Sequence, residues 1–572
     1  MRTDVKEQIK KLIIESLKKI DDVHDLDEEK IEVNSSKNKD LGDFSTNIAL
    51  KLSKQLDKNP IEIAKDILNN IKKDTCIKKI EIAKPGFINF FTSENIKFEI
   101  INTILSEKDE FGKNNIGNKE KVLVEFVSAN PTGPLHVGHG RGAAYGDCIS
   151  NLLSTSGYSV SKEYYVNDAG KQINILAVSV ILRYHELIDK NLKFRFSGLY
   201  EGDYIWDISA YILNKYNNKF FKPQSIENNE EIDEYINVIM NSLGDKFQVI
   251  KKESVDYILK DIKKTLEGFN VNFDSWFSEN KIISDQSLKK IIDVLLNKDC
   301  IEEKDGAIWF KSSNFFDEKD RVLVKANKDH TYFLSDIAYH SNKIERGYKQ
   351  IINIWGADHH GYVDRMKASF NILSNKDTQL KILLVQFANL YRGKQKIPMS
   401  TREGNFITLK ELFTEVGVDA ARFFYLMRKT EQHLDFDIEL AKSKNSENPV
   451  YYVQYAHARI CSIFKQLEEK SINYTHNVDN LKLLNKEEEV DILNKLNKYP
   501  EIIETATRKF EPHLLINYIR ELSQLFHAYY NKFKILNEEE NIRNARLSLL
   551  LSIKQILNNS SKIIGIKMPN QM

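Results

Sequence analysis

The chain has 572 residues, and its 83 Lys and Arg residues nearly balance its 82 Asp and Glu residues, giving a formal net charge of +1. This length predicts three or four domains, and the balanced charge means that any basic surface for a nucleic acid must be local. The four scattered cysteines fit no zinc spacing and no apolar run reaches the roughly 18 residues of a membrane span, so the composition excludes a membrane-spanning chain and predicts a cytoplasmic protein with free thiols.

Residues 1–115 are predicted to form a separate α/β domain. Apolar residues recur every three or four positions from Val5 to Ile20, which indicates an amphipathic helix. The elements expected after it are helices at 48–56 and 61–71 and strands at 80–82 and 87–91. A domain used only for packing and one that contacts another molecule are both compatible with this pattern.

The stretch from Lys121 to Gly157 carries the strongest signal in the chain. Its apolar run at 122–127 is typical of a strand buried on both faces, and a small-residue helix follows the sequence His136-Val137-Gly138-His139. A second strand is expected at 158–166, which completes a βαβ unit. The two histidines share the first helical turn, where unpaired N–H groups and the helix dipole attract anions, and the glycine leaves room for a flat base. This turn is therefore predicted to bind a nucleoside triphosphate.

The tetrapeptide at 136–139 resembles the first signature of class I aminoacyl-tRNA synthetases, and the string from Val124 to His139 is similar to that of bacterial arginyl-tRNA synthetases. The resemblance covers nearly the whole chain and is weakest at 185–264 and 470–545. It implies an α/β protein with a Rossmann-like parallel-sheet catalytic domain, an N-terminal α/β domain and a C-terminal all-α helical bundle. In this family the N-terminal domain grips the outer corner of the tRNA.

The resemblance also places the domain boundaries. The expected domains are an N-terminal tRNA-contacting domain at 1–115, a catalytic domain at 116–445 with an insertion at about 185–264, and a helical anticodon-binding domain at 446–572. In the last domain, aromatic residues such as Tyr451 and Tyr455 could stack on unpaired bases, although aromatics at helical spacing more often belong to a core.

The segment from Thr331 to His340 is predicted to line an amino-acid pocket. Tyr332 and Asp336 are one helical turn apart, so both side chains can reach one pocket. A guanidinium group pairs with carboxylates through its planar fork of N–H donors, so Asp336 and Glu125 could form two acidic walls of an arginine site. A surface or helix-capping carboxylate is the alternative for Asp336. The candidate arginine-binding residues are Glu125, Ser128, Asn130, Tyr332, Asp336 and His360.

A buried strand at 351–355 leads into the sequence Gly356-Ala357-Asp358-His359-His360. Asp358 could accept hydrogen bonds from ribose hydroxyls, and the resemblance places this segment at the ribose and adenine of ATP. Metal ligation is the alternative, although the side chains of adjacent residues diverge. The candidate ATP-binding residues are Pro134, Leu135, Val137, Gly138, Gly356, Asp358, His359, Met399 and Ser400.

The second class I signature, usually KMSKS, is degenerate in this chain. Aligned on Met399, both lysine positions are replaced, by Pro398 and Thr401. The chemistry still needs a cation at the leaving pyrophosphate, and Arg402 is the first candidate, with Lys394 and Lys396 behind it. The candidate catalytic residues are His136, His139, Arg402 and Lys396.

The resemblance implies an arginine–tRNA ligase that uses ATP, with Mg²⁺ bound mainly through the triphosphate. The expected partners are tRNA(Arg), L-arginine and ATP, without a membrane, and the protein is expected to be a monomer. Two alternatives stay open. One is a class I synthetase for glutamate, glutamine or cysteine, and the other is a nucleotidyltransferase or tRNA-binding paralogue that does not aminoacylate.

Overall fold

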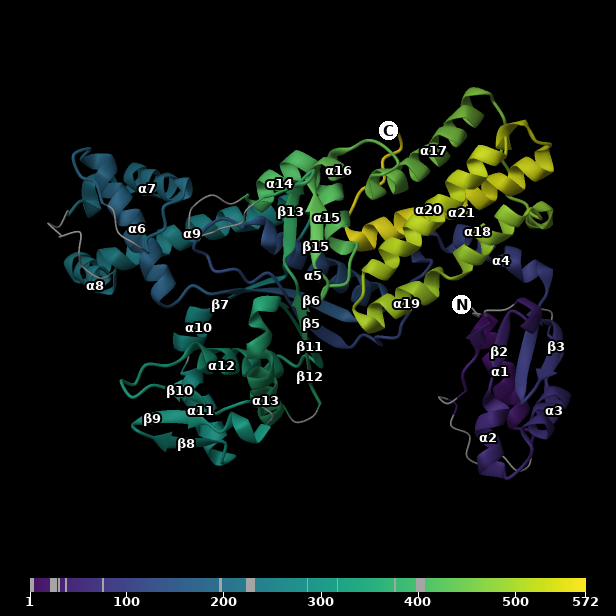
Figure 1. Ribbon diagram of the computed structural model, residues 1–572, viewed down its shortest axis with the longest axis horizontal. Coiled ribbons are helices and arrows are strands. Elements are labelled where there is room, and N and C mark those ends of the chain that lie inside the picture. The colour runs from purple at the N-terminus through teal and green to yellow at the C-terminus, as the bar shows by residue number, and fades with distance from the viewer. Residues whose placement is uncertain are drawn as a thin grey trace. The chain divides into compact units, whose positions relative to one another are not determined.

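The computed structural model describes residues 5–20, 28, 31–36, 39–74, 77–194, 198–222, 232–284, 286–315, 317–374, 377–397 and 407–572. The chain divides into two compact units (Figure 1). The first unit comprises Met1–Lys108, Ile463–Asn497 and Leu525–Gln555, and the second comprises Asp109–Ser462, Lys498–Gln524 and Ile556–Met572. No helix among the described residues is both long and apolar enough to cross a membrane.

The N-terminal part of the first unit is an antiparallel sheet with helices packed against it. The sheet has the strand order β1-β2-β4-β3. Its strands are β1 (Asn34–Ser35), β2 (Phe44–Thr46), β3 (Ile77–Ala83) and β4 (Phe87–Thr92), and its helices are α1 (Val5–Leu17), α2 (Ile48–Leu56) and α3 (Pro60–Asn70). Ile9, Ile13 and Leu17 of α1 enter the core, which confirms the predicted amphipathic helix.

The C-terminal part of the chain is helical, as expected. Its helices are α17 (Pro449–Glu469), α18 (Glu487–Asn497), α19 (Tyr499–Lys509), α20 (His513–Lys532) and α21 (Glu540–Ile564). Within the first unit, α18 packs against α4 (Glu94–Glu107), and the buried Glu489 accepts hydrogen bonds from Arg546 at 2.9 Å and Tyr529 at 3.0 Å. This ion pair is satisfied by internal hydrogen bonds, as buried charges must be.

The second unit is built on a five-stranded parallel sheet with the order β12-β11-β5-β6-β7 (Figure 1). The strands are β5 (Lys121–Glu125), β6 (Ser159–Val166), β7 (Ser275–Ser278), β11 (Gln350–Gly356) and β12 (Gln379–Val385). Val122, Leu123 and Val124 of β5 are fully buried because the strand is central and covered on both faces. The sheet confirms the predicted Rossmann-like fold.

Helices and a small sheet connect these strands, and further helices and a second small sheet follow β12. The helices are α5 (Val137–Thr155), α6 (Lys171–Ile188), α7 (Asp203–Tyr216), α8 (Ile232–Leu243), α9 (Asp245–Gly268), α10 (Glu279–Ser284), α11 (Ser287–Asn297), α12 (Tyr332–Glu345), α13 (Val363–Leu373), α14 (Leu409–Val416), α15 (Val418–Leu426) and α16 (Ile438–Lys442). The small sheets have the orders β10-β9-β8 and β14-β13-β15. Their strands are β8 (Ile301–Lys304), β9 (Ala307–Phe310), β10 (Arg321–Val324), β13 (Ala388–Arg392), β14 (Gln395–Lys396) and β15 (Leu434–Asp437).

Candidate active site

The strand order places two loops from distant parts of the sequence beside each other. β5 pairs with both β6 and β11, so the chain progresses outward in opposite directions from the boundary between β5 and β11. In open parallel sheets, ligands bind outside the carboxyl ends of the strands at this switch point. The loop after β5 carries the histidine motif and the loop after β11 carries Gly356 to His360. The fold therefore brings both predicted nucleotide segments to one edge.

His136 and His139 cap the start of α5 reciprocally. Nδ1 of His136 accepts from the backbone N–H of Gly138 at 3.1 Å, and Nδ1 of His139 accepts from the backbone N–H of His136 at 3.3 Å. Burial lowers the pKa of both rings. The pKa of His139 falls to about 3, because the neighbouring His136 lowers it further. Each neutral ring therefore carries its proton on Nε2, as a donor.

The residues around these histidines contribute backbone to the site. Leu135 and Val137 are each 1% exposed, and their backbone groups bond within the protein: the N–H of Val137 donates to the carbonyl of Ile407, and the carbonyl of Leu135 accepts from the N–H of Leu409. A Cβ added to Gly138 would lie 2.8 Å from the ring of His136. Glycine is thus required here by the capping ring itself, in addition to any approach by a base. Pro134 is half-buried beside them.

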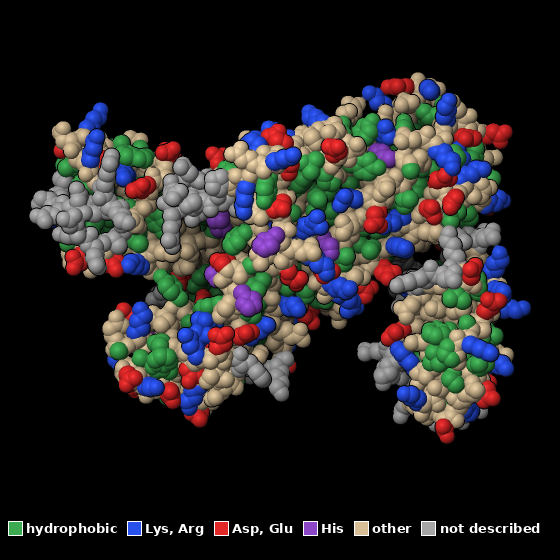
Figure 2. Space-filling model, in the orientation of Figure 1, with side chains coloured by type: hydrophobic (Ala, Val, Ile, Leu, Met, Phe, Trp, Pro, Cys, Tyr) green, Lys and Arg blue, Asp and Glu red, His purple; other side chains and the backbone are tan. Residues whose placement is uncertain are grey.

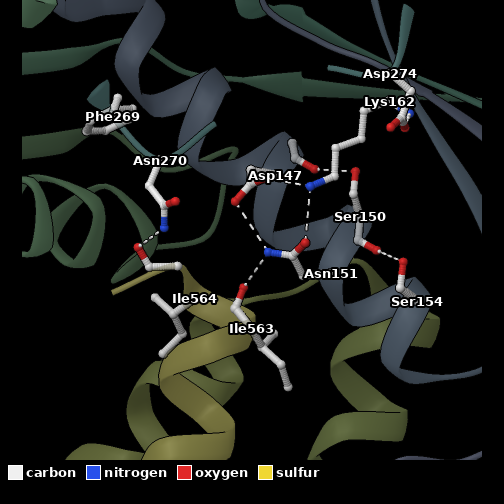
Figure 3. Close-up of polar contacts among 12 residues, drawn as sticks. Asp147, Ser150, Asn151, Ser154, Lys162, Phe269, Asn270, Asp274, Ile563 and Ile564 are labelled. Atoms are coloured by element: carbon white, nitrogen blue, oxygen red, sulfur yellow. Dashed lines mark hydrogen bonds and ion pairs between the residues drawn. The ribbon is translucent and has the colours of Figure 1, made fainter. Parts of the chain in front are cut away.

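A buried polar network holds α5 on the side away from these caps (Figure 3). Asp147 accepts from Nζ of Lys162 and from Nη2 of Arg422, both at 2.6 Å. Asn151, one turn later, donates to the carbonyl of Ile563 at 3.1 Å. The other acceptors of the fully buried Arg422 are the carbonyl groups of Phe269, Asn270 and Ile564. The helix that begins with the two histidines is therefore tied to three other segments of its unit.

Glu125 ends β5 and is buried, with 5% of its surface exposed. Its carboxylate forms an ion pair with the buried Lys343 of α12, and its Oε1 accepts from Oγ of Ser128 at 3.1 Å. Lys343 also donates to Oδ1 of Asn353 at 3.0 Å, and Nδ2 of Asn353 lies 2.6 Å from Nε2 of His340. Glu125 thus has an internal counter-cation, which the sequence analysis did not foresee when it made this residue an acidic wall.

Asp336 and Glu279 are two further acids whose pKa values are raised. Burial and the charge of Glu125 raise the pKa of Asp336 to about 7, although the hydroxyl of Tyr362 donates to Asp336. Burial and the charges of Asp336 and Asp168 likewise raise the pKa of Glu279 to about 7. Oε2 of Glu279 is buried and has no hydrogen-bond partner among the described residues. These two carboxyl groups would be stabilised in their charged form by a bound cation.

Tyr165, at the carboxyl end of β6, shows how these acids are grouped. Burial, followed by the charges of Glu279 and Asp336, raises the pKa of the Tyr165 hydroxyl. Both acids thus act electrostatically on the same hydroxyl. The acidic cluster therefore consists of Glu125 at the end of β5, Asp168 after β6, Glu279 at the start of α10 and Asp336 on α12.

The turn after β5 holds Ser128 and Asn130 in place. Val127 has a φ of 67° and Ser128 a φ of 40°, a left-handed region that costs a β-branched residue on the order of 1–3 kcal/mol. The side-chain amide of Asn130 donates to Oε1 of Gln172 at 2.7 Å and accepts from Nδ2 of Asn167 at 2.9 Å. Surrounding contacts thus fix the orientation of this candidate arginine ligand.

Tyr332 begins α12, one turn before Asp336, as the spacing predicted. It is 57% exposed. A Cβ added to Gly170 would lie 2.6 Å from the Tyr332 hydroxyl, so the glycine, with a φ of 83°, allows the ring to approach the turn that follows β6. The tyrosine is therefore an exposed residue one turn from Asp336, with its hydroxyl beside the turn that follows β6.

Asp358, His359 and His360 are exposed on the short helix η6 (Ala357–Tyr362) after β11. Nε2 of His359 lies 3.6 Å from Oδ2 of Asp358. Among the described residues, no group of three or more His, Cys, Asp or Glu side chains could hold a metal ion, so the metal alternative gains no support at this segment. Several histidine side chains gather near the middle of the second unit in Figure 2.

The loop that contains the second signature ends directly beside the histidine turn. The backbone N–H of Val137 donates to the carbonyl of Ile407 at 3.2 Å, and the N–H of Leu409 donates to the carbonyl of Leu135 at 2.8 Å. Lys396 is described and exposed on β14. Met399, Ser400 and Arg402 lie outside the described residues.

Sequence reasoning left two residues out of the pocket. Neither Glu279 nor Lys343 is among the candidate residues that the sequence predicts. Glu279 directly follows the short strand β7, much as Glu125 ends β5, and this signal could have identified it. No comparable signal marks Lys343, because its pairing with Glu125 depends on where α12 lies.

Three family models match the chain. They are the arginyl tRNA synthetase N terminal domain at residues 7–92, the catalytic domain of class I (R) tRNA synthetases at 100–437, and the DALR anticodon binding domain at 453–572. The catalytic match alone covers more than half of the 572 residues.

Individual relatives agree with these matches. An arginine–tRNA ligase of Legionella pneumophila (strain Paris) is 47% identical over 561 residues, covering 95% of each chain. One from Coxiella burnetii (strain RSA 493) is 45% identical over 547 residues, covering 93% of this chain and 92% of the relative. Thermus thermophilus arginyl-tRNA synthetase has the same fold, with a TM-score of 0.73 at 21% identity over 99% of this chain and 100% of that one. The chain therefore belongs to the arginyl-tRNA synthetase family of class I.

Proposed function

We propose that this protein activates L-arginine with ATP to form arginyl-adenylate and transfers the arginyl group to the 3′ end of tRNA(Arg), releasing AMP and pyrophosphate. The observation that carries the proposal is a pair of carboxyl groups with raised pKa values, the half-buried Asp336 and the buried Glu279, near the edge of the sheet that also presents the histidine turn. Such a pair suits a guanidinium group, whose fork of N–H donors can serve two carboxylates at once.

The first step is attack by the carboxylate of arginine on the α-phosphorus of ATP, with pyrophosphate as the leaving group. No protein nucleophile is needed, so catalysis rests on alignment and on stabilisation of charge. The Nε2–H groups of His136 and His139 donate to the triphosphate as negative charge develops on it. Because both rings are neutral, they act as hydrogen-bond donors rather than as fixed charges.

Arg402 is the cation proposed for the leaving pyrophosphate, with Lys396 as the second candidate. The chain immediately after this loop is hydrogen-bonded to the histidine turn at Val137, which supports a role for the loop at the same nucleotide. Mg²⁺ enters with ATP as part of the substrate, its ligands being mainly phosphate oxygens and water. Asp358 accepts from the ribose, with His359 and the backbone around Gly138 and Gly356 lining the nucleotide.

Within the arginine site, Asp336 and Glu279 bind the side chain, and Tyr332 closes over it. Glu125, already paired with Lys343, completes the acidic wall and holds Ser128. We propose that Asn130 and His360 contact the amino-acid end of the substrate, since Asn130 follows β5 and His360 follows β11 at the same edge of the sheet.

Transfer requires tRNA, and we propose that the domains at 1–115 and 446–572 bind it. We also propose that the enzyme is a cytoplasmic monomer. A cavity of about 730 Å³ in the second unit supports a nucleotide contact beside α17. Tyr451, which lines this cavity, stacks on Tyr455 with ring centroids 5.9 Å apart, and the guanidinium of Arg459 lies 4.5 Å from the Tyr455 centroid. Aromatic and guanidinium planes of this kind stack on unpaired bases.

The cavity is tested by Tyr451→Ala. Loss of one stacking partner should weaken tRNA binding about 10-fold or more, while arginine and ATP affinities stay unchanged. Filter binding with tRNA(Arg) transcripts measures the effect, and Tyr451→Phe, which keeps the ring, should bind like the original protein. Equal tRNA affinity for all three proteins would remove this cavity from the proposal.

The reaction itself is tested by ATP–pyrophosphate exchange with purified protein. Each amino acid should be assayed with and without tRNA(Arg), and arginine alone should support exchange in the presence of the tRNA. Exchange with glutamate, glutamine or cysteine would overturn the acidic-pocket argument. Binding of tRNA without exchange for any amino acid would instead favour a tRNA-binding paralogue that does not aminoacylate.

A further inference from the structure

Phe387 is an exposed aromatic residue at the edge of the sheet where the nucleotide loops lie. It follows β12 by two positions, and 41% of its surface is exposed. β12 is the parallel neighbour of β11, with Val385 in register with Gly356. The ring therefore belongs to the carboxyl edge that presents the candidate nucleotide site, although neither of the two signature motifs includes it.

The ring of Phe387 lies against both nucleotide loops. A Cβ added to Gly138 would be 3.5 Å from Cδ1 of Phe387, and one added to Gly356 would be 3.6 Å from Cζ. Two glycines, one after the histidine cap and one at the end of β11, thus flank the same ring. Their lack of side chains leaves this surface flat, as a planar ligand requires.

The backbone that carries Phe387 is anchored to the histidine helix. The carbonyl of Gln386 accepts from Nη1 of the buried Arg141, one turn after Gly138, at 2.8 Å, and the N–H of Gln386 donates to the carbonyl of Thr430 at 2.9 Å. The ring therefore keeps a defined position relative to the imidazoles at the start of α5. An isolated exposed phenylalanine needs no special explanation, but a fixed ring between two ligand loops does.

We propose that the ring of Phe387 stacks on the adenine of ATP and so binds and orients the nucleotide. The inference rests on the proposed ATP-dependent activation at this site and adds a residue that recognises the base. Adenine offers a flat, weakly polar face, and a phenyl ring supplies the matching surface. The imidazoles hold the phosphates at one end of the nucleotide, and the phenyl ring holds the base at the other.

The test compares ligands that contain the base with one that lacks it. Calorimetric titration of Phe387→Ala should show ATP and AMP binding about 10- to 100-fold more weakly, the loss of one stacking contact. Binding of inorganic pyrophosphate, which has no base, and of arginine should stay within about twofold of the original protein. Phe387→Trp should keep the affinity for ATP, and Phe387→Leu, apolar but without an aromatic face, should lie between the tryptophan and alanine variants.

Trp206→Ala is the matched control, because Trp206 is an aromatic of similar exposure, 37%, on helix α7. It should bind ATP as the original protein does. Unchanged or tighter ATP binding by Phe387→Ala would overturn the inference, as would equal losses for pyrophosphate and ATP. If the alanine variant does not fold, equal ATP affinity of the leucine and tryptophan variants overturns it instead. The proposed function would fail separately, through absence of arginine-dependent exchange in the unaltered protein.

Discussion

The two halves of the proposed active site have opposite electrostatic character. The amino-acid half is rich in acids: Glu125 is paired internally with Lys343, and the carboxyl groups of Asp336 and Glu279 have pKa values raised to about 7. The nucleotide half, in the described residues, relies on two neutral imidazoles and on backbone groups. The comparison suggests that a site for a cationic side chain can hold carboxyl groups with raised pKa values until the cation binds. A site for a polyanion can instead use uncharged hydrogen-bond donors.

The halves also differ in how they are built. The histidine cap is local, because its hydrogen bonds join residues no more than three positions apart. The acidic half is assembled over long distances, since the Lys343–Glu125 pair joins residues 218 positions apart. Substitutions should therefore separate the halves cleanly, with each variant affecting one substrate and sparing the other.

The largest effect is expected for Asp336→Asn, which removes a charge that would pair with the guanidinium. The value of kcat/KM for arginine should fall about 10²- to 10³-fold, as for loss of one partner in a buried charge pair. KM for ATP should change little in pyrophosphate exchange. Asp364→Asn, an exposed acid on α13, serves as the control and should behave like the original protein. A comparable rise in the KM values for arginine and ATP would contradict the assignment of the two substrates to separate halves of the site.

A change of about 10²-fold is expected on the nucleotide side for His139→Asn. The asparagine keeps an acceptor near the position of Nδ1 for the helix cap but loses the Nε2–H donor. In exchange assays kcat should fall while KM for arginine remains the same. His139→Gln, whose amide reaches the Nε2 position, should recover part of the rate. If asparagine and glutamine are equally impaired, the donor is not the group that matters.

Glu279→Gln should raise KM for arginine about 10- to 100-fold, the contribution of one charge-assisted hydrogen bond. The effect is smaller than at Asp336 because glutamine retains one acceptor oxygen for the guanidinium. Steady-state exchange at several arginine concentrations measures it, with KM for ATP as the internal control. An unaltered KM for arginine would place Glu279 outside the substrate site and leave its buried Oε2 unexplained.

The smallest expected effect is a pH dependence of arginine binding. Because the pKa values of Asp336 and Glu279 are raised to about 7, protonation competes with the guanidinium below neutral pH. KM for arginine should be about tenfold higher at pH 6 than at pH 8 if binding displaces one proton. Glu279→Gln should flatten this dependence, since it removes one of the two titrating groups.

Thermal unfolding checks the same linkage with the opposite sign. The folded pKa values of these acids exceed their ordinary values of 3.8 and 4.5, so the ligand-free protein binds more protons when folded. Their contribution to stability is therefore lost as the pH rises from about 4 to about 7. Arginine replaces the missing proton, and its stabilising shift of Tm should be greater at pH 8 than at pH 6. A shift that is independent of pH would contradict the raised pKa values.

Much of the fold could be predicted from local sequence. The apolar run of β5, the histidine turn and the small-residue helix appear in consecutive residues, and the structure confirms them as β5 and α5. The one-turn spacing of Tyr332 and Asp336 is likewise contained in five residues. The second signature could be recognised only in degenerate form, and its Arg402 remains a prediction because it lies outside the described residues.

The sequence by itself determined the family and the strand-turn-helix that carries the two histidines, because these depend on motifs, hydrogen bonds and periodicities within a few residues. Only the tertiary structure decided that Lys343 neutralises Glu125, that Glu279 joins Asp336, and that Phe387 lies between two glycines. The physical reason is that these contacts depend on the order of strands in the sheet, which brings together side chains far apart in the chain. Burial at that edge then sets their charges, and no local pattern of residues encodes it.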